Sequence, residues 1–309
     1  MGLFSKKLKS DGMTALVFRE RTLHAVTLSR SRAKPQIVSL HSFNRPDGED
    51  LALALRDNLD REASGYPVNA LLDFDDYQLL LVEAPDVRPE ELRSAVRWRL
   101  KDLINFHIDD AIIDVFEIPD QRHQNRNRMM YAVAARASRI SDAAEILENA
   151  HLTLETVDIP EMALRNLAML ADDEVNGIAL LHMDEDRSMI TLSRNGTLYL
   201  TRRWGFGSRA IREASDADAV AQLEEQVQLE IQRSLDYYDS HFPIGPLAAL
   251  VVTPTTAAIP GLTGFLSEST DLPVKTLDIG QRIDGAGQLA DGGEVLALGA
   301  ALRHEVLAL

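Results

Sequence analysis

Two parts of this 309-residue chain repeat one expected pattern, a run of short apolar strands followed by helices. The first part opens at residues 12–30, where two strands flank a charged turn at 19–22. The second opens at 177–204 with three strands, and Asn195-Gly196 between the last two is a dipeptide typical of tight hairpin turns. Because strands and helices alternate in both parts, we predict an α/β protein with two halves.

Helical spacing supports the same division. Apolar residues recur every three or four positions over 51–59 in the first half and over 220–238 in the second. The predicted boundaries are 12–176 for the first half and 177–309 for the second. The last predicted helix, at 294–308, either completes the second half or returns to the first.

An α+β unit is predicted inside the first half, at residues 79–158, in the order β-α-β-β-α-β. Its clearest element is a helix at 85–106, which has acidic residues near its start and one apolar face. Beside that face, Arg93, Arg97 and Lys101 lie four residues apart and form a basic stripe. Two interpretations stay open for the stripe: a solvated helix face, or a site that binds a protein partner or anionic lipid.

Composition narrows the classes of function. The 48 acidic and 32 basic residues give a net charge of −16, and such a surface repels phosphate backbones, so nucleic acid is not an expected partner. The chain has no cysteine, which excludes disulfides and thiolate metal sites. No apolar run reaches the roughly 18–20 residues that a membrane-spanning helix needs. Residues 1–11 are expected to form a flexible basic terminus, whose lysines allow peripheral contact with an anionic membrane.

Several longer stretches carry a resemblance that covers nearly the whole chain. They include "EELRSAVRWRLKDLINFHIDDAIIDVFEIP" at 90–119, "RNGTLYLTRRWGFG" at 194–207 and "LEIQRSLDYYDS" at 229–240. In this order and spacing the chain resembles the PilM-type actin-like proteins of type IV pilus assembly, most closely the MshI group of mannose-sensitive haemagglutinin (MSHA) pilus systems. The resemblance implies a two-lobed actin-like (ribonuclease H-like) α/β fold with an inserted α+β subdomain (1C-like) in the first lobe.

The resemblance also indicates which residues to compare with an ATP-binding site. Active actin-like proteins bind ATP through three glycine-bearing turns, where backbone N–H groups approach the phosphates and an Asp orients the magnesium. Here these turns fall at 18–22, 182–186 and 253–256, and none has the expected glycine. The substituted positions are Arg19, Glu20, Arg21, His182, Asp184 and Thr255. We therefore expect a degenerate pocket with no cofactor and no catalytic residue, and a functional ATP–Mg site is the alternative.

A metal site is a further alternative at the second turn. His182 and the three acids at 184–186 are residue types that bind metal ions. Acid-rich hairpin turns are usually only solvated, so we predict no metal there.

The function implied by the resemblance is that of a non-catalytic scaffold, cytoplasmic and peripheral to the inner membrane. Its expected partner is a bitopic inner-membrane protein of the PilN/MshJ type, whose cytoplasmic tail it would dock, and the pilus assembly motor is a second expected contact. Two other functions stay open: an ATP-dependent actin-like switch or ATPase, and a scaffold like the L proteins of type II secretion.

Overall fold

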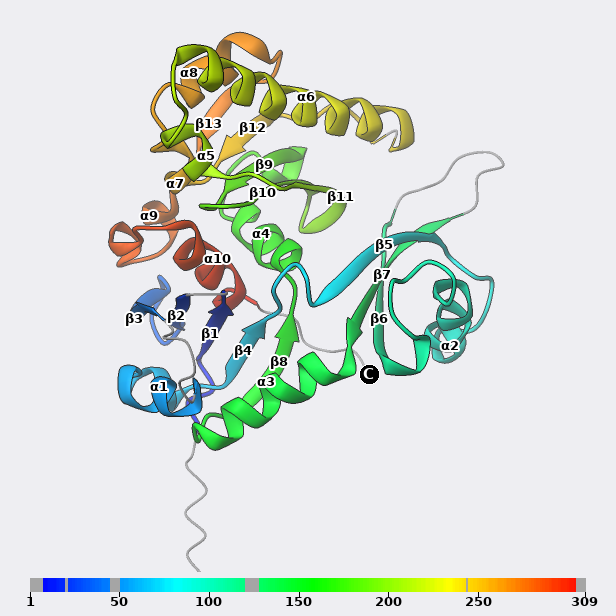
Figure 1. Ribbon diagram of the computed structural model, residues 1–309, viewed down its shortest axis with the longest axis vertical. Helices are drawn as coiled ribbons and strands as arrows, with labels where there is room; N and C mark the ends of the chain where they lie inside the picture. The colour runs from blue at the N-terminus through cyan, green and yellow to red at the C-terminus, as the bar shows by residue number, and fades with distance from the viewer. Residues whose placement is uncertain (1–7, 20–21, 45–50, 120–127, 243, 304–309) are drawn as a thin grey trace, which may run out of the picture.

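The computed structural model describes residues 8–19, 22–44, 51–119, 128–242 and 244–303. These parts form two lobes, each built around a five-stranded sheet, and a three-stranded sheet lies beside them (Figure 1). The predicted two-lobed α/β architecture is confirmed. None of the helices in these parts combines the length and the apolar character that a membrane span requires.

The sheet of the first lobe mixes antiparallel and parallel strands. In spatial order it consists of β3 (Gln36–Asn44), β2 (Thr22–Ser29), β1 (Gly12–Phe18), β4 (Val68–Leu71) and β8 (Leu154–Asp158). The first three strands pair antiparallel, whereas β4 and β8 run parallel to β1. Helices α1 (Leu51–Asn58) and α3 (Ala137–Asn149) cover one face, where Leu16 packs with Leu55 and Leu147.

The sheet of the second lobe repeats this arrangement. In spatial order it consists of β11 (Thr197–Trp204), β10 (Ser188–Arg194), β9 (Ile178–Met183), β12 (Ala249–Val252) and β13 (Val274–Thr276). Asn195 and Gly196 have φ angles of 51° and 72°, which confirms the predicted tight turn between β10 and β11. Helices α6 (Ala217–His241) and α8 (Leu262–Ser269) cover the outer face of this sheet.

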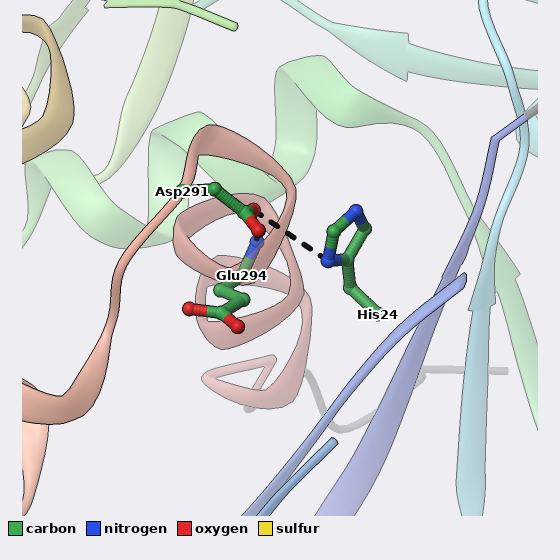
Figure 2. Close-up of side chains that lie close together, drawn as sticks. All are labelled: His24, Asp291 and Glu294. Carbon is green, nitrogen blue, oxygen red and sulfur yellow. Dashed lines mark hydrogen bonds and ion pairs between the residues drawn. The ribbon is translucent and has the colours of Figure 1, made fainter. Parts of the chain in front are cut away.

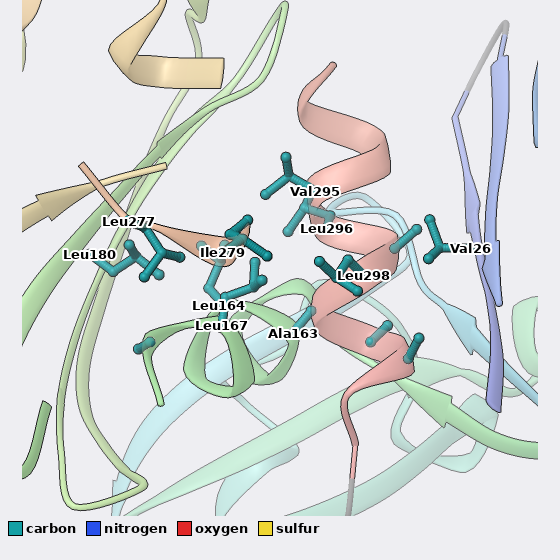
Figure 3. Packing of buried hydrophobic residues seen from close by; sticks show 14 of the residues in the cluster. Val26, Ala163, Leu164, Leu167, Leu180, Leu277, Ile279, Val295, Leu296 and Leu298 are labelled. Carbon is teal, nitrogen blue, oxygen red and sulfur yellow. The ribbon is translucent and has the colours of Figure 1, made fainter. Parts of the chain in front are cut away.

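Two helices, α4 (Pro160–Ala168) and α10 (Gly292–Ala301), fill the space between the two large sheets. Figure 3 shows α10 side chains lying between Val26 of β2 and the leucines of α4, with Leu180 of β9 beyond. A Cβ on Gly299 would lie 2.3 Å from the carbonyl oxygen of Ala163, so the two helices are in backbone contact there. The last described helix therefore packs on the first lobe, although it follows the second lobe in the chain.

The inserted subdomain is smaller than the unit predicted at 79–158. Its sheet has the order β5-β7-β6, from β5 (Tyr77–Glu83), β7 (Met129–Arg136) and β6 (Ala111–Glu117). One face carries α2 (Pro89–Leu100), and the other faces the second lobe, where the Tyr131 hydroxyl donates to the carbonyl oxygen of Tyr199 at 3.3 Å. The last strand of the predicted unit, β8, pairs instead with β4, and α3 packs beside α1, because a local apolar pattern does not specify which sheet a strand joins.

Two predicted helices also have different ends. The helix predicted at 85–106 begins at Pro89, because Arg88 before the proline is extended, and it ends at Leu100. The helix predicted at 294–308 begins at Gly292, and residues 304–308 lie outside the described residues. The remaining helices are α5 (Ser208–Arg212), α7 (Pro254–Ala257), α9 (Ile279–Arg282) and the 3-10 turns Ala63–Gly65, Ile108–Asp110, Glu174–Asn176 and Ala286–Gln288.

Candidate functional site

Arg19 connects two of the three turns that the sequence singles out. Its guanidinium lies 2.7 Å from Asp184 Oδ2, in the turn between β9 and β10, and 3.1 Å from Asp73 Oδ1, which follows β4. Only 15% of the Arg19 side chain is exposed, so both ion pairs are largely shielded from solvent ions. Glu20 and Arg21 lie outside the described residues. The first turn is thus tied by an ion pair to the second lobe.

Asp184 is enclosed by the surrounding backbone. Burial by itself would raise its pKa, but the charge of Arg19 and hydrogen bonding to the Glu185 N–H help to lower the pKa below the usual value. A Cβ on Gly207 would lie 2.2 Å from the Asp184 carbonyl oxygen, and one on Gly292 would lie 2.8 Å from its Oδ1. The carboxylate is therefore ionised at neutral pH and already paired with Arg19.

His182 connects the second turn to the third. Its Nδ1 lies 3.2 Å from the Thr253 hydroxyl oxygen, which lies 2.8 Å from that of Thr256, and the Thr256 hydroxyl accepts from the Met183 N–H at 2.8 Å. His182 Nε2 is buried and has no hydrogen-bond partner among the described residues. Burial lowers the pKa of His182 to about 4, so the ring is neutral at pH 7 and serves as a packed, hydrogen-bonded part of the core.

The buried His182 predicts a specific loss of stability in acid. Its folded-state pKa of about 4 lies below the unfolded value of about 6.5, so between these pH values the unfolded chain binds a proton that the folded chain does not. The free energy of unfolding should therefore fall as the pH falls through this window, with about 2 kcal/mol due to His182 between pH 7 and pH 4.5. Urea unfolding should show this contribution in the wild type and not in His182→Gln; equal pH slopes in the two proteins would contradict it.

A small depression lies next to the second and third turns. Its volume is about 270 Å³, just below the roughly 300–1,000 Å³ of typical small-molecule sites. Asp184, Glu185 and Asp291 line it together with Thr255, and Arg212 lies at its wall 3.4 Å from Glu185. The Thr255 hydroxyl is buried without a hydrogen-bond partner among the described residues. Three carboxylates against one guanidinium make this depression a poor site for a phosphate group.

The acids of the second turn do not fit a magnesium site in this arrangement. A magnesium ion needs free oxygen ligands in octahedral geometry. Asp184 is paired with Arg19, and Arg209 pairs with Glu185 and, at 2.8 Å, with Asp186. Each acid of the turn thus has a basic partner within the chain.

A second polar cluster, not predicted from the sequence, lies between β2 and α10. Figure 2 shows His24 of β2 facing Asp291 and Glu294 at the start of α10, with His24 Nδ1 3.5 Å from Asp291 Oδ1. Asp291 accepts from the Glu294 N–H at 2.9 Å, and Glu294 accepts from the Ala290 N–H and the Ser42 hydroxyl at 2.6 Å each. These hydrogen bonds cap the helix, so the cluster is explained as a helix start. The sequence signal was an acid followed three residues later by Glu, in "DGGE" at 291–294.

A family model described as "Type IV pilus assembly protein PilM" matches residues 81–219. Over this segment the chain is PilM-like. The matched segment contains α2, β6 and β7 of the inserted subdomain and the strands β9 to β11 of the second lobe. The second turn lies within it, whereas the first and the third lie outside.

Solved structures match over almost the whole length. One described as "PilM-PilN type IV pilus biogenesis complex" has a TM-score of 0.74 at 18% identity, covering 94% of this chain and 98% of that chain. The cytoplasmic domain of EpsL, an inner-membrane component of the type II secretion system of Vibrio cholerae, has a TM-score of 0.53 at 13% identity, covering 95% and 96%. A Bacteroides thetaiotaomicron protein with an actin-like ATPase fold has a TM-score of 0.56 at 10% identity, covering 99% and 100%. These structures confirm the actin-like fold, and a comparison with curated proteins finds no match.

The predicted basic stripe lies on α2 and just after it, within the PilM-like segment. Arg93 lies 3.0 Å from Asp114, and Arg97 lies 3.1 Å from Asp109, so both pair with acids of their own subdomain. Lys101, at the end of the helix, is exposed and has no ion pair among the described residues. Arg93 and Lys101 face solvent, as predicted, whereas Arg97 is half-buried and also donates to the Ala111 carbonyl oxygen at 3.2 Å. The charge of the stripe is partly neutralised, and its partner-binding role stays a prediction.

The same helix of the PilM-like segment exposes a large aromatic side chain. Trp98 is 78% exposed, and Leu103 beyond the end of the helix is 54% exposed. The side chains of α2 that are fully buried against the sheet are instead Val96 and Leu100. An exposed tryptophan beside arginines has the composition of an interaction hot spot.

Proposed function

We propose that this chain is a non-catalytic docking component of type IV pilus assembly that binds the cytoplasmic tail of a PilN-like bitopic protein at the inner membrane. The observation that carries the proposal is the match of residues 81–219 to the PilM family model, together with the overall likeness to a PilM–PilN complex. Binding at this place puts the protein in the cytoplasm, peripheral to the membrane, where it also meets the assembly motor.

The absence of a catalytic step is part of the proposal. The Arg19 side chain pairs with acids of both lobes, and the adjoining depression is lined by carboxylates. A nucleoside triphosphate would have to displace Arg19 from its two ion pairs and bind next to the carboxylates of the depression. The geometry therefore supports a scaffold over an ATP-dependent switch or ATPase.

We further propose that the pilus system is of the MSHA type, so that the chain acts as MshI does and its partner is MshJ-like. The sequence stretches given above support this narrower assignment. An L-like scaffold of type II secretion is the second candidate, favoured by the likeness to the EpsL cytoplasmic domain.

Binding of a synthetic PilN/MshJ-type cytoplasmic tail to the purified chain tests the docking function. We expect the double change Arg93→Glu and Arg97→Glu to weaken binding about tenfold or more, because it reverses two positive charges of the basic stripe. Arg233→Glu is the matched control, since Arg233 is an exposed arginine paired with Glu230 on α6 of the second lobe. Isothermal titration calorimetry measures both variants, with and without ATP and magnesium.

The outcomes separate the scaffold from the ATP-dependent switch. Binding that is weakened only by the α2 double change, and that is equal with and without nucleotide, supports the proposed scaffold. Tail binding that requires ATP would favour the switch. A tail that does not bind the wild type would overturn the proposed function. If the α2 double variant binds the tail as tightly as the Arg233→Glu control and the wild type do, the basic stripe is excluded as its site.

A further inference from the structure

Residues 73–77, "DFDDY", form a short connection with contacts to several parts of the molecule. They leave the first lobe at the end of β4 and enter the inserted sheet at Tyr77, the first residue of β5 (Figure 1). Their side chains contact arginines of the second lobe, although more than a hundred residues separate them in the chain. This segment therefore touches the first lobe, the inserted subdomain and the second lobe.

Three guanidinium groups surround the ring of Phe74. The Cζ atoms of Arg19, Arg187 and Arg203 lie 5.5, 5.5 and 5.2 Å from its centroid. Separations below about 6 Å allow cation–π attraction. Arg187, in the turn between β9 and β10, and Arg203, in β11, belong to the second lobe. Two of the three guanidinium groups around the ring therefore come from the lobe that does not contain Phe74.

Ion pairs reinforce this contact. Arg187 lies 2.6 Å from Asp75 Oδ2 and 3.5 Å from Asp73 Oδ1. Asp73 also pairs with Arg19, which in turn pairs with Asp184 of the second lobe. Asp73 and Asp75, on either side of Phe74, thus pair with two of the three arginines around its ring.

A buried carboxylate depends on the same contact. Glu161, at the start of α4, is 0% exposed and accepts from the Tyr77 hydroxyl at 2.5 Å. Arg203 Nε lies 3.6 Å from the other oxygen of Glu161, and Arg203 Nη1 donates to the Tyr77 hydroxyl at 3.4 Å. A buried charge is costly unless it has partners of opposite charge. Arg203 of the second lobe supplies that partner, and the same guanidinium also contacts Tyr77 of the 73–77 segment.

We propose that Phe74, Tyr77, Arg187 and Arg203 form an internal latch, the Phe74 latch, which fixes the two lobes and the inserted subdomain in one arrangement without any bound ligand. Because β5 begins at Tyr77, a change in the angle between the lobes would also change the position of the inserted sheet. The latch therefore couples the position of the inserted subdomain to closure of the lobes. This inference stands independently of the partner proposed above.

Pulsed electron paramagnetic resonance can measure the distance between the lobes. The chain has no cysteine, so Asp57→Cys on α1 and Glu268→Cys on α8 place one spin label on each lobe without side reactions. We expect one narrow distance distribution in the otherwise wild-type chain. Phe74→Leu keeps an apolar side chain but removes the ring face, and it should broaden the distribution and shift it to longer distances.

Two arginine variants complete the test. The Arg187 side chain is 36% exposed, so the Arg187→Ala variant should fold. It should broaden the distance distribution as Phe74→Leu does. Arg209→Ala is the control, because Arg209 pairs with Glu185 and Asp186 inside the second lobe, and it should leave the distribution narrow. Distributions for Phe74→Leu and Arg187→Ala that match the wild type, in variants shown to be folded by circular dichroism, would overturn the latch. Equal broadening by Arg209→Ala would also overturn it, because the effect would then not depend on contacts between the lobes.

Discussion

Gly299→Ala should lower the free energy of unfolding by about 2–3 kcal/mol. The added Cβ would lie 2.3 Å from the Ala163 carbonyl oxygen, 2.8 Å from its carbonyl carbon and 3.0 Å from Leu167 Cγ. Two of these atoms are backbone, so α10 and α4 have to move apart, and both helices lie in the core between the two sheets. Urea denaturation followed by circular dichroism measures the change.

Gly264→Ala provides the matched control. Gly264 lies inside α8, and no atom lies within 4 Å of the Cβ that alanine would add. Replacing a helical glycine in open space should raise the free energy of unfolding by roughly 0.5–1 kcal/mol. If both alanine variants changed the free energy of unfolding in the same direction and by the same amount, close packing of α10 on α4 would not explain the effect of Gly299→Ala.

Arg19→Ala should lower the free energy of unfolding by about 2–3 kcal/mol. The change leaves Asp73 and Asp184 without their shared partner, and their side chains are only 25% and 18% exposed. The pKa of Asp184, now lowered mainly by Arg19, should rise in this variant, because burial then acts without its opposing charge. Urea unfolding at pH 7 measures the loss of stability.

A double-mutant cycle identifies the source of this loss. Asp184→Asn removes the second charge, so Arg19→Ala should cost less in the Asp184→Asn background than in the wild type. Equal costs in both backgrounds would show that the ion pair between the lobes contributes nothing. Arg209→Ala, which removes an exposed pair of the second lobe, should cost no more than about 1 kcal/mol.

Local sequence patterns predicted the elements well. The strands around the charged turn at 19–22, the Asn195-Gly196 turn and the core of the helix within 85–106 all depend on neighbours a few residues away. Such neighbours set backbone preference directly, so periodicity and turn chemistry were sufficient. The repetition of the pattern predicted two α/β halves, and the structure shows that both lobes share one sheet arrangement.

Pairings between distant residues were not predictable in this way. The pairing of β8 with β4 and the placement of α3 beside α1 depend on which apolar faces meet after folding. The same holds for Arg19 and Asp184, which are 165 residues apart, and for the acids that neutralise Arg93 and Arg97. The start of α10 was a different case, because the acid–x–x–Glu signal at 291–294 was present in the sequence and a search for helix caps would have found it.

The location of α10 has a consequence for the order in which the molecule can assemble. This helix covers the inner face of the first lobe's sheet, yet residues 292–301 follow every other described helix and strand in the chain. During synthesis the apolar side chains of β1 and β2 on that face stay without their native cover until residues 292–301 have been made. The first lobe therefore cannot complete its packing before α10 is present. Chaperones that bind apolar surface would meet the lobe in this incompletely packed form.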